Sequence, residues 1–212
     1  VGISKKSSRM LEDFSKAVVE YKPDLIGMSA IESIFERGLR LTRVAKKITN
    51  VPIIAGGIFA TLAPEIVIKE DSIDIVCVGE GEDALVELCK RLMARKDYLD
   101  IGSLWIKRGD VVVKNEPMFL KPLDLVAEPD FSSFDLKMFY RPMQGNIFKT
   151  IPIELARGCP FQCTYCAEPS LSRLYSKNVK TQRYFRVKSM KKAIAEIENG
   201  IKKYSPDFFY FA

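Results

Sequence analysis

The chain has 212 residues, 47% of them hydrophobic, a composition typical of a globular protein with a buried core and one or two domains. No apolar run approaches the roughly 18 residues of a membrane-spanning helix and no secretory signal begins the chain, so we expect no transmembrane segment and a cytoplasmic protein. The 33 Lys and Arg residues give a formal net charge of +6, but they are scattered along predicted helices and offset by 27 Asp and Glu residues, which argues against a nucleic acid partner.

The first part of the chain, residues 1–97, alternates apolar runs with amphipathic helical patterns. Apolar residues at helical spacing predict helices over 8–21, 36–49, 63–70 and 82–95. Short apolar runs predict strands over 24–30, 51–57 and 73–82. Strands that alternate with helices in this way form a parallel sheet covered on both faces, so we expect a doubly wound α/β domain. The opening strand of such a domain is missing, with Val1 to Ile3 at best its remnant.

Residues 98–149 follow a different pattern. Two alternating segments around Gly109 predict a β-hairpin. The stretch from Pro117 to Pro142 is rich in Pro, Asp and Phe, which predicts an irregular linker packed over a surface.

Residues 150–212 predict the start of a second domain. The segment 151–158 predicts a strand that enters a cysteine-rich loop, 189–205 predicts the first helix after that loop, and residue 206 begins another strand. That last strand ends with the chain, and no helix follows to cover it. We therefore expect a chain that is truncated at both ends.

Three of the five cysteines, Cys159, Cys163 and Cys166, lie within eight positions and form a C-x3-C-x2-C motif. An odd number of cysteines with this crowding does not suit a disulfide framework and favours reduced thiols. Thiolates bind metals, and one compact loop allows three sulfurs to converge on a single centre. Structural zinc is the alternative, but it takes four Cys or His ligands and the chain has no histidine. Cys77 and Cys89 lie on a predicted strand and helix and are interpreted as core thiols.

This spacing, with Tyr165 before the last cysteine and Arg157-Gly158 before the first, resembles the C-x3-C-x-aromatic-C motif of the radical S-adenosylmethionine (SAM) superfamily. The resemblance implies that the three cysteines hold a [4Fe-4S] cluster whose open iron binds SAM, and that Tyr165 lies near the adenine. It also implies that residues 150–212 begin a radical SAM partial (β/α) barrel. The glycine-rich segment and later strands that complete the SAM pocket of that family are not in this sequence.

A basic run follows the cysteine loop. Arg183, Arg186 and Lys188 are interpreted as a solvated surface, with an anionic substrate or the cluster as the alternative partner.

Small and polar residues follow the predicted strands of the first domain. Open parallel sheets bind ligands at the carboxyl ends of their strands, where glycine allows a cofactor to approach the backbone. The residues at these ends are Ser29, Gly56, Gly57, Gly79, Glu80 and Gly81. Glu82 then opens a helix, a position at which the helix dipole favours a carboxylate. The alternative interpretation is that these glycines only shape turns.

The segments KPDLIGMSAIES, IIAGGIFATLAPE and DIVCVGEGEDAL, ahead of a radical SAM cysteine loop, resemble the Rossmann-like cobalamin-binding domain of cobalamin-dependent radical SAM enzymes. The resemblance implies that Ser29, Gly56 and Gly57 surround the nucleotide tail and corrin edge, with Gly79 to Gly81 beside them. The chain contains no histidine that could ligate cobalt, which leaves the identity of the lower ligand open.

Together the two resemblances imply an oxygen-sensitive enzyme that reductively cleaves SAM to a 5′-deoxyadenosyl radical. They favour methylation of an unreactive carbon, with a reductant such as flavodoxin or ferredoxin. A radical SAM cyclase or oxidoreductase of the same architecture is the alternative within enzymes, and an iron-sulfur binding or electron-relay module without catalysis is the alternative of another class. The substrate, whether small molecule, lipid, tetrapyrrole or peptide, is not readable from the sequence, and no catalytic residue beyond the cofactor ligands is assigned.

Overall fold

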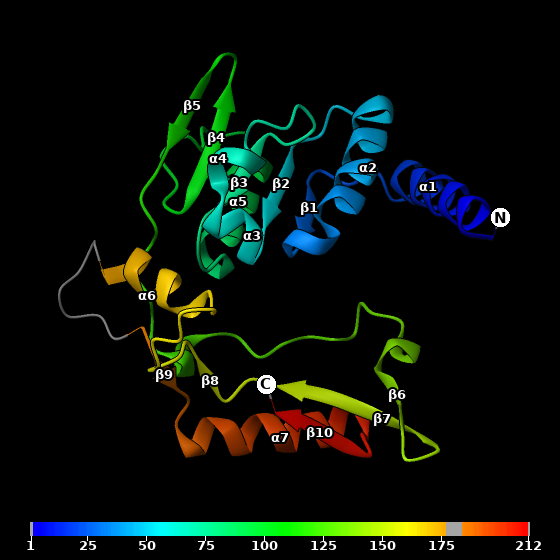
Figure 1. Cartoon of the computed structure of the whole chain (residues 1–212), viewed down its shortest axis with the longest axis vertical. Helices are drawn as coiled ribbons and strands as arrows, with labels where there is room; N and C mark the ends of the chain where they lie inside the picture. The colour runs from blue at the N-terminus through cyan, green and yellow to red at the C-terminus, as the bar shows by residue number, and fades with distance from the viewer. Residues whose placement is uncertain (1, 177–183, 212) are drawn as a thin grey trace. The chain divides into compact units, whose positions relative to one another are not determined.

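The structure is a computed structural model that describes residues 2–176 and 184–211 (Figure 1). The chain divides into two compact units, Val1–Met118 and Phe119–Ala212. The predicted hairpin lies in the first unit and almost all of the predicted linker lies in the second. Within the described ranges, no helix combines the length and the apolar character needed to cross a membrane.

The first unit is built on a five-stranded mixed sheet. Its helices are α1 (Gly2–Tyr21), α2 (Glu32–Ile48), α3 (Ile58–Leu62), α4 (Pro64–Val67) and α5 (Glu82–Met93). Its strands are β1 (Ile26–Ser29), β2 (Ile53–Gly56), β3 (Ile75–Cys77), β4 (Leu104–Arg108) and β5 (Val111–Lys114). The strand order is β1-β2-β3-β4-β5, in which β1 to β3 run parallel, whereas β4 pairs antiparallel with β3 and β5. This α/β architecture with a parallel sheet confirms the predicted fold class.

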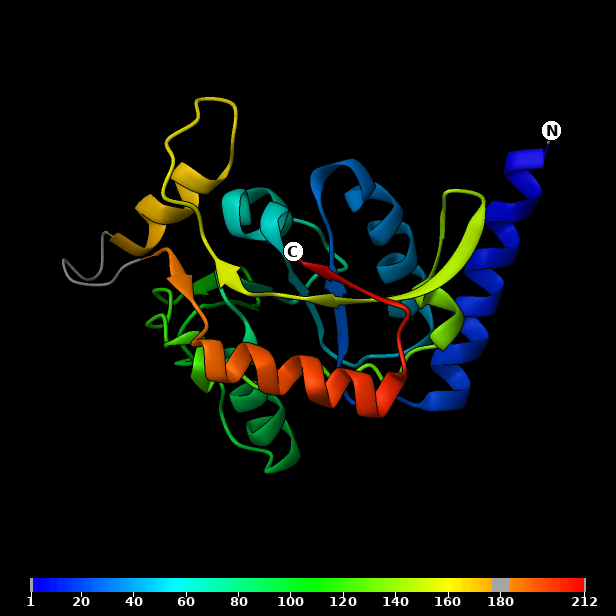
Figure 2. The same ribbon diagram turned by 90° about the horizontal axis from the view of Figure 1, so that it is seen from below.

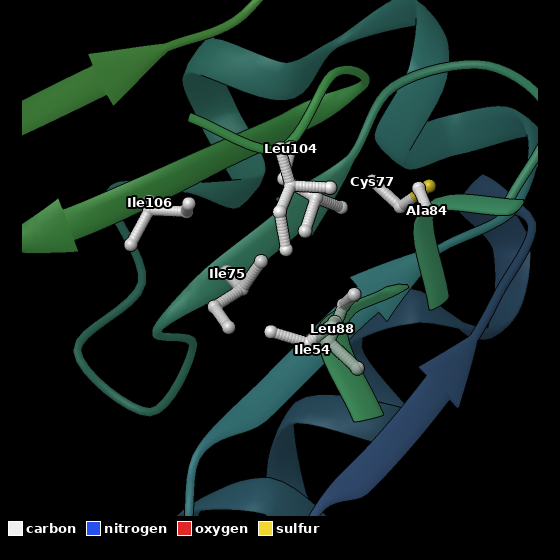
Figure 3. Close-up of a cluster of buried hydrophobic side chains, with 8 residues drawn as sticks. Ile54, Ile75, Cys77, Ala84, Leu88, Leu104 and Ile106 are labelled. Atoms are coloured by element: carbon white, nitrogen blue, oxygen red, sulfur yellow. The ribbon is translucent and has the colours of Figure 1, made fainter. Parts of the chain in front are cut away.

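One core cluster of the first unit lies between the sheet and α5 (Figure 3). Every residue of β3 is buried, as expected for a strand covered on both faces. The labelled members of this cluster are Ile54, Ile75, Cys77, Ala84, Leu88, Leu104 and Ile106. Burial of each large apolar side chain stabilises the fold by about 1.5 to 3 kcal/mol. The cluster therefore anchors the strand ends at which the predicted ligand-binding turns begin.

The first helix corrects one prediction. The expectation that Val1 to Ile3 is the remnant of a strand is wrong, because Gly2 and Ile3 lie within α1. In a helix the carbonyls of its first residues accept bonds from N–H groups one turn later, whereas a strand of three residues depends on a neighbouring strand. Val1 itself lies outside the described residues.

The second unit contains a three-stranded sheet, a short two-stranded ladder and two α-helices among its described residues. Its strands are β6 (Tyr140–Met143), β7 (Asn146–Ile153), β8 (Ala156–Arg157), β9 (Arg186–Val187) and β10 (Phe208–Phe211). Its helices are the 3-10 turns η1 (Leu123–Leu125) and η2 (Leu136–Phe139) and the α-helices α6 (Glu168–Ser176) and α7 (Met190–Tyr204). Figure 2 shows α7 along one face of the sheet, where Ile151 and Tyr204 are buried together.

The strands β7 and β10 pair in parallel, and the connection between them ends with α7, which forms a β-α-β unit, the repeating element of a (β/α) barrel. The predicted helix at 189–205 and the strand after residue 206 are thus confirmed. The predicted strand at 151–158 begins earlier, because β7 starts at Asn146 and pairs antiparallel with β6. The predicted linker is therefore not wholly irregular, since it contains η1 and η2 and reaches into β6. The helix α6 directly after the cysteine loop was not predicted.

Candidate functional site

The carboxyl ends of the parallel strands β1, β2 and β3 share one edge of the first sheet. In the β1–β2 register, Ser29 is the partner of Gly56. The backbone N–H of Ala30 donates to the carbonyl of Gly56 over 3.3 Å, so the pairing continues one residue past β1. The structure thereby places the predicted residues Ser29 and Gly56 side by side.

The turn after β2 is possible only with glycine. Gly57 has φ +91°, and a Cβ at this position would lie 2.8 Å from Ser29 Oγ and 3.2 Å from the backbone N and O of Ala30. Both the conformation and the contact exclude a side chain. Gly57 and Ser29 are exposed. The Gly57 turn therefore presents bare backbone to solvent beside the end of β1.

The loop after β3 is joined to the Gly57 turn by one side chain. Gly79 has φ +94°, and its N–H donates to Thr61 Oγ1 over 3.0 Å. The same hydroxyl donates to the carbonyl of Gly57 over 3.0 Å. Sequence reasoning missed Thr61, because the predicted helix began at residue 63, whereas α3 already starts at Ile58. A hydroxyl residue one helical turn after paired glycines was the available signal.

The thiol of Cys77 lies beneath this edge. A Cβ on Gly81 would lie 3.3 Å from Cys77 Sγ, and a Cβ on Gly56 would lie 3.8 Å from Cys77 Cβ. Burial, followed by the negative charge of Glu82, raises the pKa of the Cys77 thiol to about 11. Cys77 is thus a neutral core thiol at physiological pH, as the sequence predicted. Its neighbour in the loop, Glu80, is partly buried.

Apolar side chains frame the same edge of the sheet. Ile31, Ile58 and Leu85 lie at or beside the first turns of α2, α3 and α5, and their exposed fractions are 54%, 38% and 43%. Helix starts that follow parallel strands lie at the carboxyl edge of the sheet. The edge therefore combines exposed glycine backbone with an apolar rim, an arrangement suited to a broad ligand with apolar faces and polar groups at its border. The rim residues were not identified from the sequence.

The cysteine loop lies between β8 and α6 of the second unit. All three of its cysteines are free; Cys163 and Cys166 are exposed and Cys159 is partly exposed. The N–H of Cys166 donates to the carbonyl of Cys163 over 3.2 Å, and the Tyr165 side chain is 91% exposed. In the part of the chain that the structure describes, no three Cys, His, Asp or Glu side chains are grouped as metal ligands. The loop thus offers its thiols to solvent but does not gather them around one point.

The strand that enters the loop is fixed by a close backbone contact. Gly158 has φ +87°, and a Cβ there would lie 2.8 Å from the carbonyl oxygen of Tyr184 and 3.0 Å from its ring. The β8–β9 ladder pairs Arg157 with Arg186 directly before this glycine. Arg157 also makes two 2.9 Å hydrogen bonds to the carboxylate of Glu154. The position of Cys159 therefore depends on a glycine packed against Tyr184, two residues before β9.

The exit of the loop is anchored by α6. Tyr175 of α6 stacks on Tyr184, with ring centroids 5.8 Å apart, and both pack against Leu120. The same tyrosine that contacts Gly158 thus contacts the helix after the last cysteine. Both ends of the cysteine loop are held by Tyr184.

The prediction that the basic run after the loop is a solvated surface is wrong for Lys188, whose side chain is buried. The Nζ of Lys188 lies 2.6 Å from Glu196 Oε2, and the two side chains are only 3% and 6% exposed. Such a charge is buried because its partner in α7 is buried with it. Arg186 is partly buried and donates to the carbonyl of Lys121 over 2.7 Å. Arg183 lies outside the described residues.

Comparisons with known proteins show which proteins the chain is similar to. Residues 2–89 match the family model described as the B12 binding domain. The anaerobic magnesium-protoporphyrin IX monomethyl ester cyclase of Rubrivivax gelatinosus is 28% identical over 203 residues, which cover 92% of this chain and 34% of that protein. An uncharacterized methyltransferase of Pyrococcus horikoshii is 30% identical over 202 residues, which cover 90% of this chain and 40% of that protein.

Among solved structures, the radical S-adenosylmethionine methyltransferase TsrM from Kitasatospora setae, with cobalamin and a [4Fe-4S] cluster bound, has a TM-score of 0.63 at 16% identity. The match covers 94% of this chain and 40% of TsrM, so it shows a shared fold. The chain spans 34% and 40% of the length of the two curated relatives.

Proposed function

We propose that this chain, whose residues 2–89 match the B12 binding domain model, is the cofactor-binding part of a cobalamin-dependent radical SAM enzyme. The observation that carries the proposal is the order of the two candidate sites in one chain. A glycine-lined sheet edge is followed by a three-thiol loop placed after the strands β7 and β8.

Cobalamin fits the edge of the first sheet. The turns at Gly57 and Gly79 leave backbone uncovered where any side chain at Gly57 would strike Ser29, and the exposed apolar rim suits the faces of a corrin. The residues proposed to hold the cofactor are Ser29, Gly56, Gly57, Gly79, Glu80 and Gly81. The chain has no histidine, so within it no imidazole serves as the lower ligand of cobalt.

The donor set of the cysteine loop fits an iron-sulfur cluster. Three free thiols in one loop, Cys159, Cys163 and Cys166, are the donors that a [4Fe-4S] cluster with one open iron requires. When bound, the cluster would supply the electron for SAM cleavage. Tyr165, which is exposed beside these thiols, is proposed to contact the adenine. The role of β8, β9 and α6 is to hold the two ends of the loop.

The reaction we propose is methylation of an unreactive carbon, with one SAM molecule as methyl source for cobalt and another as radical source. A methyltransferase among the relatives and another among the structural neighbours support it. The magnesium-protoporphyrin ester cyclase favours radical cyclisation of a tetrapyrrole as the second candidate. A flavodoxin or ferredoxin is the proposed reductant, and a cytoplasmic setting would keep the thiols reduced.

The test uses the full-length protein that contains this chain, purified and reconstituted anaerobically. We expect stoichiometric iron and sulfide, a broad visible absorbance that is lost in the Cys159→Ala/Cys163→Ala/Cys166→Ala variant, and bound cobalt. Formation of 5′-deoxyadenosine from SAM would separate an enzyme from an electron-relay module. Zinc in place of iron would refute the radical mechanism.

A further inference from the structure

One buried hydroxyl connects the two glycine turns at the carboxyl edge of the first sheet. Thr61 lies on α3 with 7% of its surface exposed. Its Oγ1 donates to the carbonyl of Gly57 and accepts the N–H of Gly79, both over 3.0 Å. A hydroxyl can donate and accept at the same time, which no apolar side chain of the same shape can do.

The two hydrogen bonds of Thr61 differ in the distance along the chain that they span. The bond to Gly57 is local, since a threonine in a helix often bonds the carbonyl four residues earlier. The bond to Gly79 crosses from α3 to the loop after β3, 18 residues further along the chain. Both glycines have positive φ, and glycine loses more conformational freedom on ordering than any other residue. The tie that Thr61 Oγ1 makes between the two turns therefore restricts two glycines that would otherwise have wide conformational freedom.

The tie extends to the end of β1. The Gly57 turn is packed so closely on Ser29 that a Cβ at Gly57 would meet its Oγ at 2.8 Å. The N–H of Ala30 in turn donates to Gly56. The ends of all three parallel strands are thus linked in one series of contacts, with Thr61 at the step that joins the second strand to the third.

We infer that Thr61 is a positioning residue of the cobalamin site, whose hydroxyl holds the Gly57 turn and the Gly79 to Gly81 loop at the spacing that the corrin and its tail require. The inference rests on the proposed function. Binding to a preformed site costs less ordering of loops, so losing the tie lowers affinity even though Thr61 itself touches no ligand.

The experiment compares two threonine-to-valine variants of the 212-residue chain. Thr61→Val keeps the shape and removes the tie. Thr42→Val is the matched control, because Thr42 is also buried, with 2% of its surface exposed. Its hydroxyl likewise makes two hydrogen bonds, one to the carbonyl of Leu39 and one with Ser72 Oγ. Neither partner is a residue of the proposed cobalamin site. Thr61→Ser restores the hydroxyl.

Aquocobalamin is the probe, and its visible spectrum and the quenching of protein fluorescence report binding. We expect Thr61→Val to bind about tenfold more weakly than the wild type, as the loss of one buried hydrogen bond predicts. Thr61→Ser and Thr42→Val should stay close to wild-type affinity, although both valine variants lower the melting temperature. Wild-type affinity in Thr61→Val, or equal weakening in Thr42→Val, would overturn the inference.

Hydrogen–deuterium exchange of residues 77–82 without ligand supplies a second readout. Faster exchange in Thr61→Val, with protection regained in Thr61→Ser, supports the tie; unchanged exchange overturns it. If the wild-type chain binds no aquocobalamin, the proposed function fails, and the exchange result still decides whether Thr61 couples the two turns.

Discussion

The substitution Gly158→Ala tests whether the entry to the cysteine loop is set by the contact of Gly158 with Tyr184. An L-residue at φ +87° costs about 1 to 2 kcal/mol. The added Cβ would also meet the backbone oxygen of Tyr184 at 2.8 Å, which forces β8 and β9 apart and weakens a ladder hydrogen bond worth about 1 kcal/mol. We expect a total loss of about 2 to 3 kcal/mol in the free energy of unfolding. For a chain of this length that corresponds to a melting temperature lower by about 4 to 12 °C.

Urea denaturation and iron content after anaerobic reconstitution measure the two consequences. The matched control is Gly145→Ala, because Gly145 has φ +79° in the same unit but a Cβ there meets no atom within 4 Å. The control should lose only the conformational part, about 1 to 2 kcal/mol, and should bind iron as the wild type does. Gly158→Ala should lose more stability and bind less iron. If the two variants are equally stable and load iron equally, the contact with Tyr184 does not position the loop.

Three further predictions concern single side chains. Lys188→Met leaves the buried Glu196 carboxylate without its main partner and should cost about 3 kcal/mol in urea denaturation, most of it regained in Lys188→Met/Glu196→Leu; an equally unstable double variant would contradict this. The Cys77 thiol, with its pKa raised from 9.0 to about 11, favours folding while it is protonated, so stability should fall as the pH rises through that interval, and Cys77→Ala should flatten the fall; an unchanged slope would argue against it. Tyr165→Ala, at a side chain 91% exposed, should change stability by less than about 0.5 kcal/mol, so that weaker SAM binding by the full-length variant would report a lost ligand contact.

Hydrophobic patterning was enough to place most of the first unit. The strands β2 and β3 are buried on both faces, so their apolar runs are continuous and stand out from the amphipathic helices beside them. The short helix α3 was missed, because its five residues are too few for a periodic pattern. Thr61 was missed as well, because its partner Gly79 is distant in the sequence and only the fold brings the two together.

In the second unit, local sequence signals were too short, or depended too much on the tertiary fold, to predict α6 and the burial of Lys188. The helix α6 begins with Glu168 followed by Pro169, a usual start for a helix, but its nine residues are too few for a clear periodic pattern. The burial of Lys188 could not be predicted, because a lysine is buried only when a partner such as Glu196 is supplied by the tertiary fold. The motif identified the three cysteines, but their spacing does not determine how the free thiols lie.

The antiparallel strand β5 closes the strand order of the first sheet, so its outer backbone groups pair with no further strand of that sheet. Three consecutive valines, from Val111 to Val113, would make such a border a template for self-association into larger aggregates. The ammonium group of Lys114, which lies 4.1 Å from the ring centre of Trp105, sets a positive charge at that border. Like charges at this border would oppose the pairing of two copies edge to edge.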